Sequence, residues 1–204
     1  MSGTARSYHM ILRVSTGVFY KPKQSVFGEL RPREKELLKP YLFQNGKRIA
    51  YITGGSLYNQ MGLTTQVPKS IRVASKVKRV TTKIGKTQVK PVKSYVDVTN
   101  ENYYLLEILD ALKDFKTIPD LDKKSALKLL KNKISKLSKN DRLKITRYAM
   151  KYPPRATALL GAILELSQKK DGLESLKTNL NPLTTYTLGI NEETLLTAPK
   201  WNIN

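Results

Sequence analysis

Cysteine is absent from this chain of 204 residues, and histidine occurs once, at His9. The lack of cysteine excludes a disulfide scaffold, a thiolate nucleophile and any zinc site built on cysteine ligands. With a single histidine, the common pairs of nucleophile and general base have no members. We therefore expect a protein of a reducing compartment that is not an enzyme and that binds no cofactor and no metal.

Long apolar runs are also missing. The longest, residues 158–164, is far too short to cross a bilayer, and the first twenty residues hold no run that resembles a signal peptide. Residues 53–56 (TGGS) lack the Lys-Ser/Thr ending of a phosphate-binding P-loop, so we interpret them as a turn between a strand and a helix. We expect a cytoplasmic protein with no membrane contact.

Acidic residues are absent between Glu36 and Asp97, a stretch that carries twelve lysines and arginines. Residues 1–96 hold 19 basic side chains against three acidic ones, a balance of +16, whereas the remainder holds 18 against 13, a balance of +5. So many positive side chains repel one another, and this pattern favours a surface that binds a polyanion. Nucleic acid is the first candidate and an acidic protein surface the second. An anionic membrane is less favoured, because no strongly amphipathic helix accompanies the charge.

The first half of the chain has the glycine, proline and asparagine spacing of short strands and turns. This spacing predicts, in order, a tight hairpin over residues 11–20, a short helix over residues 30–40 with Pro40 after its end, a turn at Asn45 and Gly46, a strand over residues 49–53, and a brief helix that Ser56 caps and Gly62 ends.

Residues 69–98 have the strongest strand pattern, because valine and isoleucine recur there among lysine, arginine and threonine. Gly85 and Lys86 supply a hairpin turn, and the alternation breaks between Ser75 and Val80, where we expect a bulge or a change of register. The pattern predicts a small, mainly antiparallel sheet with one apolar face and one cationic face.

The apolar residues take the spacing of helices after Thr99, so the fold class is α+β. A bundle of about four helices is expected, and the tail after it is expected to wrap on the body, held by Trp201. The first helix carries the apolar stripe of residues 105–115, and the second begins at about Asp122. The third spans residues 138–152, and the fourth spans the strongly apolar residues 155–169.

Five basic residues of the predicted sheet are candidate contacts to phosphate. Arg79 is the one expected to make a bidentate contact, because its guanidinium is a planar fork. Five tyrosines lie in or near the basic half and could stack on bases: Tyr51, Tyr58, Tyr95, Tyr103 and Tyr104. Such tyrosines more often complete the edge of a core, the interpretation that we favour for Tyr103 and Tyr104. The alternative is a solvated, lysine-rich face. The five candidates are Lys76, Lys78, Arg79, Lys83 and Lys86.

Three carboxylates form the best acidic cluster. Glu107, Asp110 and Asp114 are spaced by three and four residues, so they share one face of a predicted helix and could hold Mg²⁺. That face is opposite the leucine stripe, and we therefore expect the three carboxylates to lie in solvent and to pair with lysines.

Four stretches carry a resemblance to a known family: RVSTGVFYKPK at 13–23, YITGGSLYNQMGLTTQVPK at 51–69, ENYYLLEILDALKDFKTIPD at 101–120 and RYAMKYPPRATALLGAILE at 147–165. The run GLTTQVP at 62–68 is the most specific of these motifs. Together they resemble the AbiEi-type antitoxin and transcriptional regulator family of bacterial abortive-infection toxin-antitoxin systems, over nearly all of the chain after residue 10.

The resemblance implies a winged helix-turn-helix joined to an α+β antitoxin domain, in a protein that represses its own operon and neutralises a nucleotidyltransferase toxin. It implies that Arg13, Lys21 and Lys23 belong to the wing and contact DNA. Ten unpatterned residues stand where the preceding helices are expected, so we expect the helix-turn-helix to be truncated. Without a recognition helix to reach base edges, DNA binding should be weak, salt-dependent and poorly selective for an operator.

The sequence thus predicts three parts: residues 1–23, an unpatterned start with the remnant of a wing; residues 24–98, a basic, β-rich part of an antitoxin domain; and residues 99–204, its helical part. Three functions remain open. The first is a DNA-binding antitoxin-like regulator. The second is a module that binds nucleic acid or an acidic partner with no antitoxin role. The third is a nucleotide-handling enzyme that uses the three carboxylates.

Overall fold

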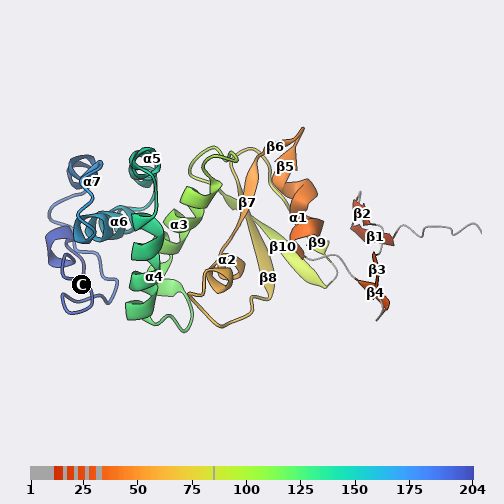
Figure 1. The fold of residues 1–204 in the computed structure, drawn as a ribbon, viewed down its shortest axis with the longest axis horizontal. Helices are drawn as coiled ribbons and strands as arrows, with labels where there is room; N and C mark the ends of the chain where they lie inside the picture. The colour runs from red at the N-terminus through yellow and green to blue at the C-terminus, as the bar shows by residue number, and fades with distance from the viewer. Residues whose placement is uncertain (1–11, 16–17, 21–22, 26–27, 31–33, 85) are drawn as a thin grey trace, which may run out of the picture.

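The structure is a computed structural model, and it describes residues 12–15, 18–20, 23–25, 28–30, 34–84 and 86–204, with side chains from residue 36 onward. The fold is α+β, as the sequence predicts: every strand lies before residue 94, and most helices follow it (Figure 1).

A four-stranded mixed sheet organises the first half, in the order β7-β8-β10-β9. The β7–β8 and β9–β10 pairings are antiparallel, in agreement with the expectation, but the longest pairing, β8 with β10, is parallel. Parallel neighbours need a crossover connection. Between β8 and β10 the chain runs through residues 76–81 and strand β9, so the predicted break after Ser75 is a loop. The strands are β7 (Ala50–Thr53), β8 (Ser70–Ser75), β9 (Thr82–Ile84) and β10 (Thr87–Lys93).

Each face of the sheet meets different helices. Helix α1 (Glu34–Leu42) lies on one side, and α2 (Gly55–Gln60) and α3 (Tyr103–Lys113) lie on the other (Figure 1). Successive side chains of a strand point to opposite faces, so alternate residues enter two separate cores. The core under α1 contains Leu38, Leu42, Ala50, Ile71, Val73, Val80, Ile84 and Val89.

The helical half confirms the four expected helices and adds a fifth, α7. Asp122 and Ser138 cap α4 and α5, because their side chains accept hydrogen bonds from the backbone N–H of Ser125 and Asp141. Helix α6 is buried around nearly its whole circumference. None of the described helices is long and apolar enough to cross a membrane. The bounds are α4 (Lys123–Ser135), α5 (Lys139–Ala149), α6 (Pro154–Leu166) and α7 (Leu173–Asn179).

Two predicted helix ends were wrong. Pro40 lies inside α1 rather than after it, because burial of Leu38 and Leu42, one turn apart, carries the helix to residue 42. Helix α2 begins after Gly54, not at Ser56. Gly54 has a φ of 68°, a left-handed conformation that glycine adopts without steric cost, and no side chain caps the helix.

Three small hairpins complete the strand content. The predicted hairpin is confirmed as β1 (Leu12–Ser15) paired with β2 (Val18–Tyr20), and β3 (Lys23–Ser25) pairs with β4 (Gly28–Leu30), which was not expected. In the third, β5 (Phe43–Gln44) and β6 (Lys47–Arg48) flank the predicted turn. Asn45 and Gly46 in that turn both have positive φ, the signature of a two-residue hairpin loop.

Trp201 holds the C-terminal tail on α6, as the sequence predicts. It lies in the short 3₁₀ helix η2 (Pro199–Trp201), is only 2% exposed, and donates a hydrogen bond from Nε1 to the Glu165 carboxylate at 2.7 Å. Its ring packs directly on the backbone of Gly161, where a Cβ would lie 2.2 Å from the indole. The tail therefore depends on a position in α6 that has no side chain.

We predict that Gly161→Ala destabilises the fold by about 2 kcal/mol through overpacking. In a helix interior, alanine is normally more stabilising than glycine by about 1 kcal/mol. A loss of stability would therefore identify the contact with Trp201 as its cause. Urea unfolding measures it. Trp201→Leu replaces the indole with a smaller side chain. In the Gly161→Ala background it should therefore lower the free energy of unfolding much less than it does alone. Strictly additive effects would contradict this account.

Candidate nucleic-acid interface

The strand register places basic side chains on the sheet face opposite α1. Lys90 is the direct partner of Arg72, and Lys83 is the partner of Gln88. Their neighbours Ile71 and Val89 point into the α1 core, so the alternation directs Arg72, Lys83 and Lys90 to the other side. All three are exposed there. The predicted division of the sheet into an apolar and a cationic face is only partly correct, because Tyr51, Ala74 and Val92 of this same face pack into the second core.

A short loop at the end of β8 presents Lys76, Lys78 and Arg79. The Ser75 hydroxyl accepts hydrogen bonds from the N–H groups of Val77 at 3.3 Å and Lys78 at 3.1 Å, and donates to the carbonyl of Ile49 at 2.7 Å. Val80, buried in the α1 core, anchors the other end of the loop. Both ends are therefore fixed by buried groups, and the basic side chains between them are exposed.

This loop borders a hollow of about 400 Å³ at the edge where β8 and β10 end. Because the two strands are parallel, both finish at this edge, and Lys93 of β10 joins the loop residues around the hollow. At the opposite end of β10 lies Lys86, exposed and roughly 20 Å away along the strand. We call the whole set the cationic track. Its members are Arg72, Lys76, Lys78, Arg79, Lys83, Lys86, Lys90 and Lys93.

The track carries little compensating charge. Lys76 forms an ion pair with Asp97 at 2.9 Å, but both side chains are largely exposed, and such a pair contributes about 0–1 kcal/mol. Among the described residues, no other member of the track forms an ion pair. Most of the positive charge is therefore available to an external anion.

Arg72 was missed by the analysis of the sequence, although a signal was present. It stands between Ile71 and Val73, both buried in the α1 core, and the alternation alone places it on the opposite face. Its side chain lies along Gly54, where a Cβ would be 2.8 Å from Arg72 Cδ. The glycine that begins α2 thus also makes room for a basic residue of the track.

The wing residues are only partly described. Arg13 lies in β1 and Lys23 in β3, and their side chains are outside the described part of the structure, as is the whole of Lys21. Strand β1 contacts β9, the strand that carries Lys83. The backbone therefore brings the predicted wing next to one end of the cationic track.

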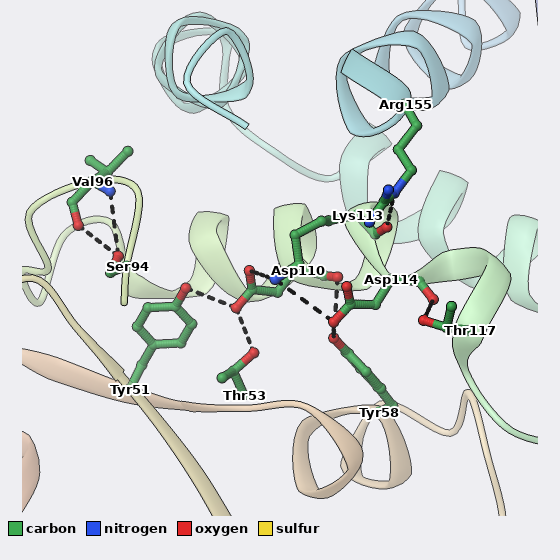
Figure 2. A network of polar contacts seen from close by, with 10 residues as sticks. All are labelled: Tyr51, Thr53, Tyr58, Ser94, Val96, Asp110, Lys113, Asp114, Thr117 and Arg155. Carbon is green, nitrogen blue, oxygen red and sulfur yellow. Dashed lines mark hydrogen bonds and ion pairs between the residues drawn. The ribbon is translucent and has the colours of Figure 1, made fainter. Parts of the chain in front are cut away.

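The expectation for the acidic cluster was wrong at Asp110. This residue is 2% exposed, because α3 packs on β7 through the helix face that carries it. Asp110 Oδ2 accepts hydrogen bonds from the hydroxyls of Tyr51 at 2.9 Å and Thr53 at 2.5 Å, and Lys113 Nζ lies 3.2 Å from Oδ1 (Figure 2). The leucine stripe faces the helices, and the opposite face of α3 is covered by the sheet.

Asp114 extends the same network toward α2. The hydroxyl of Tyr58 donates to Asp114 Oδ2 at 2.5 Å and approaches the Asp110 carbonyl at 3.2 Å, and Lys113 lies 3.7 Å from Asp114 (Figure 2). Tyr51 and Tyr58 are both buried and hold carboxylates, so they do not offer rings to bases. Tyr95 remains 40% exposed.

Burial dominates the protonation of this network. It raises the pKa of the Asp110 carboxyl, while the Lys113 ammonium and the hydroxyls of Thr53 and Tyr51 oppose that rise. Burial also raises the pKa of Tyr51 and Tyr58, with their neighbouring carboxylates adding to the effect, so both phenols keep the protons that they donate. Glu107, Asp110 and Asp114 do not form a metal centre: no described group of three or more histidine or acidic residues is placed to hold an ion.

The fold and site define an α+β protein with a cationic sheet face and a buried polar link between sheet and helices. The chain belongs to the family of unknown function DUF6088, whose profile matches residues 5–145. The matched range includes the whole cationic track and the Asp110 network, and it ends within α5. No curated protein and no solved structure matches this chain.

We predict that Asp110→Ala lowers the free energy of unfolding by about 3 kcal/mol, since it leaves two buried hydroxyls and a nearly buried ammonium without their acceptor. The matched change Asp97→Ala, at an exposed ion pair, should cost less than about 1 kcal/mol. Urea unfolding of both variants measures the difference, and equal costs would show that the Asp110 network does not stabilise the fold.

A second prediction concerns pH. Because the folded pKa of Asp110 is raised, its contribution to stability is complete below the unfolded value of about 3.9 and is lost as pH rises through the folded value. Asp110→Asn has no such loss. The difference in unfolding free energy should therefore move in favour of the variant as pH rises above about 4, the unfolded value. A movement the other way would mean that pairing with Lys113 outweighs burial.

Proposed function

We propose that this chain is a non-catalytic, cytoplasmic protein that binds nucleic acid through the cationic track. The observation that carries the proposal is the exposure, on one face and one edge of a single sheet, of eight basic side chains that form one ion pair among the described residues, Lys76 with Asp97. Side chains that have no internal partner keep their full charge for phosphate. The cost of holding so many like charges together falls when a polyanion neutralises them.

The geometry of the track suits a phosphate backbone better than a small anion. Lys86 and Lys90 of the β10 segment share one face with Lys83 and Arg72 on the strands beside it, and Lys93 at the end of β10, roughly 20 Å from Lys86, joins the loop residues. Duplex DNA carries phosphates about every 3.4 Å along each strand, so several would lie over such a track. Contacts of this kind position a protein on DNA but carry no base sequence.

The proposed role in the cell is that of an antitoxin-like regulator of a toxin-antitoxin operon, with a nucleotidyltransferase-type toxin as the cognate partner. This step rests on the resemblance of residues 13–23, 51–69, 101–120 and 147–165 described above. In this role the sheet supplies affinity for the operon's DNA, and operator preference is weak, since the described members of the basic track lie on strands and a loop and not on a helix.

The enzyme alternative loses its main support. It required Glu107, Asp110 and Asp114 to act together on a nucleotide, and Asp110 instead accepts three hydrogen bonds inside the fold. Replacing all three carboxylates is therefore not a neutral test of function, because the change at Asp110 would destabilise the protein whatever its activity.

We predict that Lys83→Glu with Lys90→Glu weakens binding to a duplex at least tenfold and lowers the slope of log K against log salt by about 2, one phosphate contact for each residue. Fluorescence anisotropy over a range of salt concentrations measures both quantities. The fold should persist, because both positions are exposed and surface changes are usually mild. The same experiment with Lys78→Glu and Arg79→Glu examines the loop end of the track.

The matched control is Lys151→Glu with Lys170→Glu, which changes the net charge equally at two exposed positions of the helical half. It should leave affinity within about twofold of wild type. If the control weakens binding as much as the track variant, only net charge matters and the track is not the interface. Affinity that does not depend on salt would remove the electrostatic proposal altogether.

A further inference from the structure

Helix α4 carries a second basic surface, well separated from the cationic track. Residues 123–140 contain seven lysines and no acidic residue. Lys124, Lys128 and Lys131 are spaced by four and three, so they form one line along the helix. Figure 1 places α4 among the helices, with α2 and α3 between it and the sheet strands β8 and β10. A ligand on α4 would therefore not compete with one on the track.

This line of lysines borders a groove of about 410 Å³ between α4, α6 and the C-terminal tail. The floor is apolar: Leu127 of α4, Ile163 and Leu166 of α6, and Leu195 of the tail. Leu166 is only half-buried, although it lies on the core helix. The groove thus combines a floor that favours apolar side chains with a cationic rim.

The groove continues along α4 into a second hollow of about 360 Å³, which shares Ser125 and Lys128 with the first. Lys133 and Lys136 border this second part. Helix α4 has 13 residues and is roughly 20 Å long. An extended peptide of about six residues spans that distance.

The rim lysines have little internal compensation. Lys128 and Lys131 form no ion pair and no hydrogen bond within the described residues, and Lys124 has only the nearby cap residue Asp122. Glu192 and Glu193 precede the tail residues that wall the groove, yet neither forms an ion pair with a rim lysine in the described part. The rim lysines are therefore available to pair with an anionic ligand.

We propose that the groove between α4 and α6 binds an acidic segment of a partner protein, with apolar side chains on the leucine floor and carboxylates on Lys124, Lys128 and Lys131. The lysines imply that the partner is negatively charged, and the apolar floor implies that the partner is a protein segment with apolar side chains. A phosphate backbone would meet the lysines but would leave the half-buried Leu166 in the floor uncovered. The proposal is independent of DNA binding by the sheet.

The test uses the full chain and a labelled synthetic peptide in which Glu and Asp are interspersed with Leu and Phe. Two matched peptides accompany it, one with Ser in place of every apolar residue and one with Lys in place of every acid. Fluorescence anisotropy at about 50 mM and 300 mM salt gives the affinities. We expect binding of the first peptide only, weakened but not abolished by salt, because the apolar contacts are not screened.

Two pairs of charge reversals locate the site. Lys128→Glu with Lys131→Glu should weaken peptide binding about tenfold or more, whereas Lys83→Glu with Lys90→Glu, an equal change on the sheet, should leave it within about twofold. Circular dichroism melting confirms that both variants are folded. With a DNA duplex as the probe, the sheet variant should lose more affinity than the α4 variant. The two probes therefore test the proposed track and the proposed groove separately.

Three results would overturn the proposal. The first is an absence of binding by the acidic and apolar peptide in wild type. The second is equal binding of the Ser-containing peptide, which would mean that charge alone acts and the floor does not. The third is a loss of duplex binding in the Lys128→Glu and Lys131→Glu variant as large as in the sheet variant, which would make α4 part of a nucleic-acid surface instead.

Discussion

The four-stranded sheet has two faces: α1 packs on one, and α2 and α3 cover part of the other. Because side chains alternate along a strand, the residues that build the core under α1 oblige their neighbours to face the other way. On β7 those neighbours, Tyr51 and Thr53, meet α3 and become buried. On β9 and the first part of β10 the same alternation directs Lys83 and Lys90 into solvent. The proposed interface is thus the uncovered part of a face whose other part is core.

The polar network at Asp110 joins these two parts of the molecule. An ionised carboxylate is costly to bury unless hydrogen bonds and an opposite charge compensate it, and here two hydroxyls from β7 and the Lys113 ammonium offset part of that cost. These contacts need one arrangement of α3 relative to the sheet, whereas apolar contacts tolerate small shifts. The network therefore specifies how the helical half docks on the sheet, with Tyr58 of α2 as a second attachment through Asp114.

The proposed surfaces differ in the chemistry that they offer. The cationic track presents charge on strands and on a loop with fixed ends, which suits a regular backbone of phosphates. The groove beside α4 adds an apolar floor to its lysines, which suits side chains of a protein. Because α2 and α3 separate them, the two proposed partners would not compete for one surface.

Local patterns were sufficient for much of this protein: the α+β class, the starts of α4 and α5, the Asn45-Gly46 turn and the apolar face of the sheet all follow from residue spacing within short segments. The parallel pairing of β8 with β10, the continuation of α1 through Pro40 and the burial of Asp110 did not follow. Each depends on what packs against the segment from far away in the chain. Hydrophobic periodicity identifies which face of an element is apolar. It does not show whether the opposite face of α3 lies in water or against a sheet, because that depends on the tertiary arrangement. In this protein the sheet covers that face, and Asp110 is therefore buried.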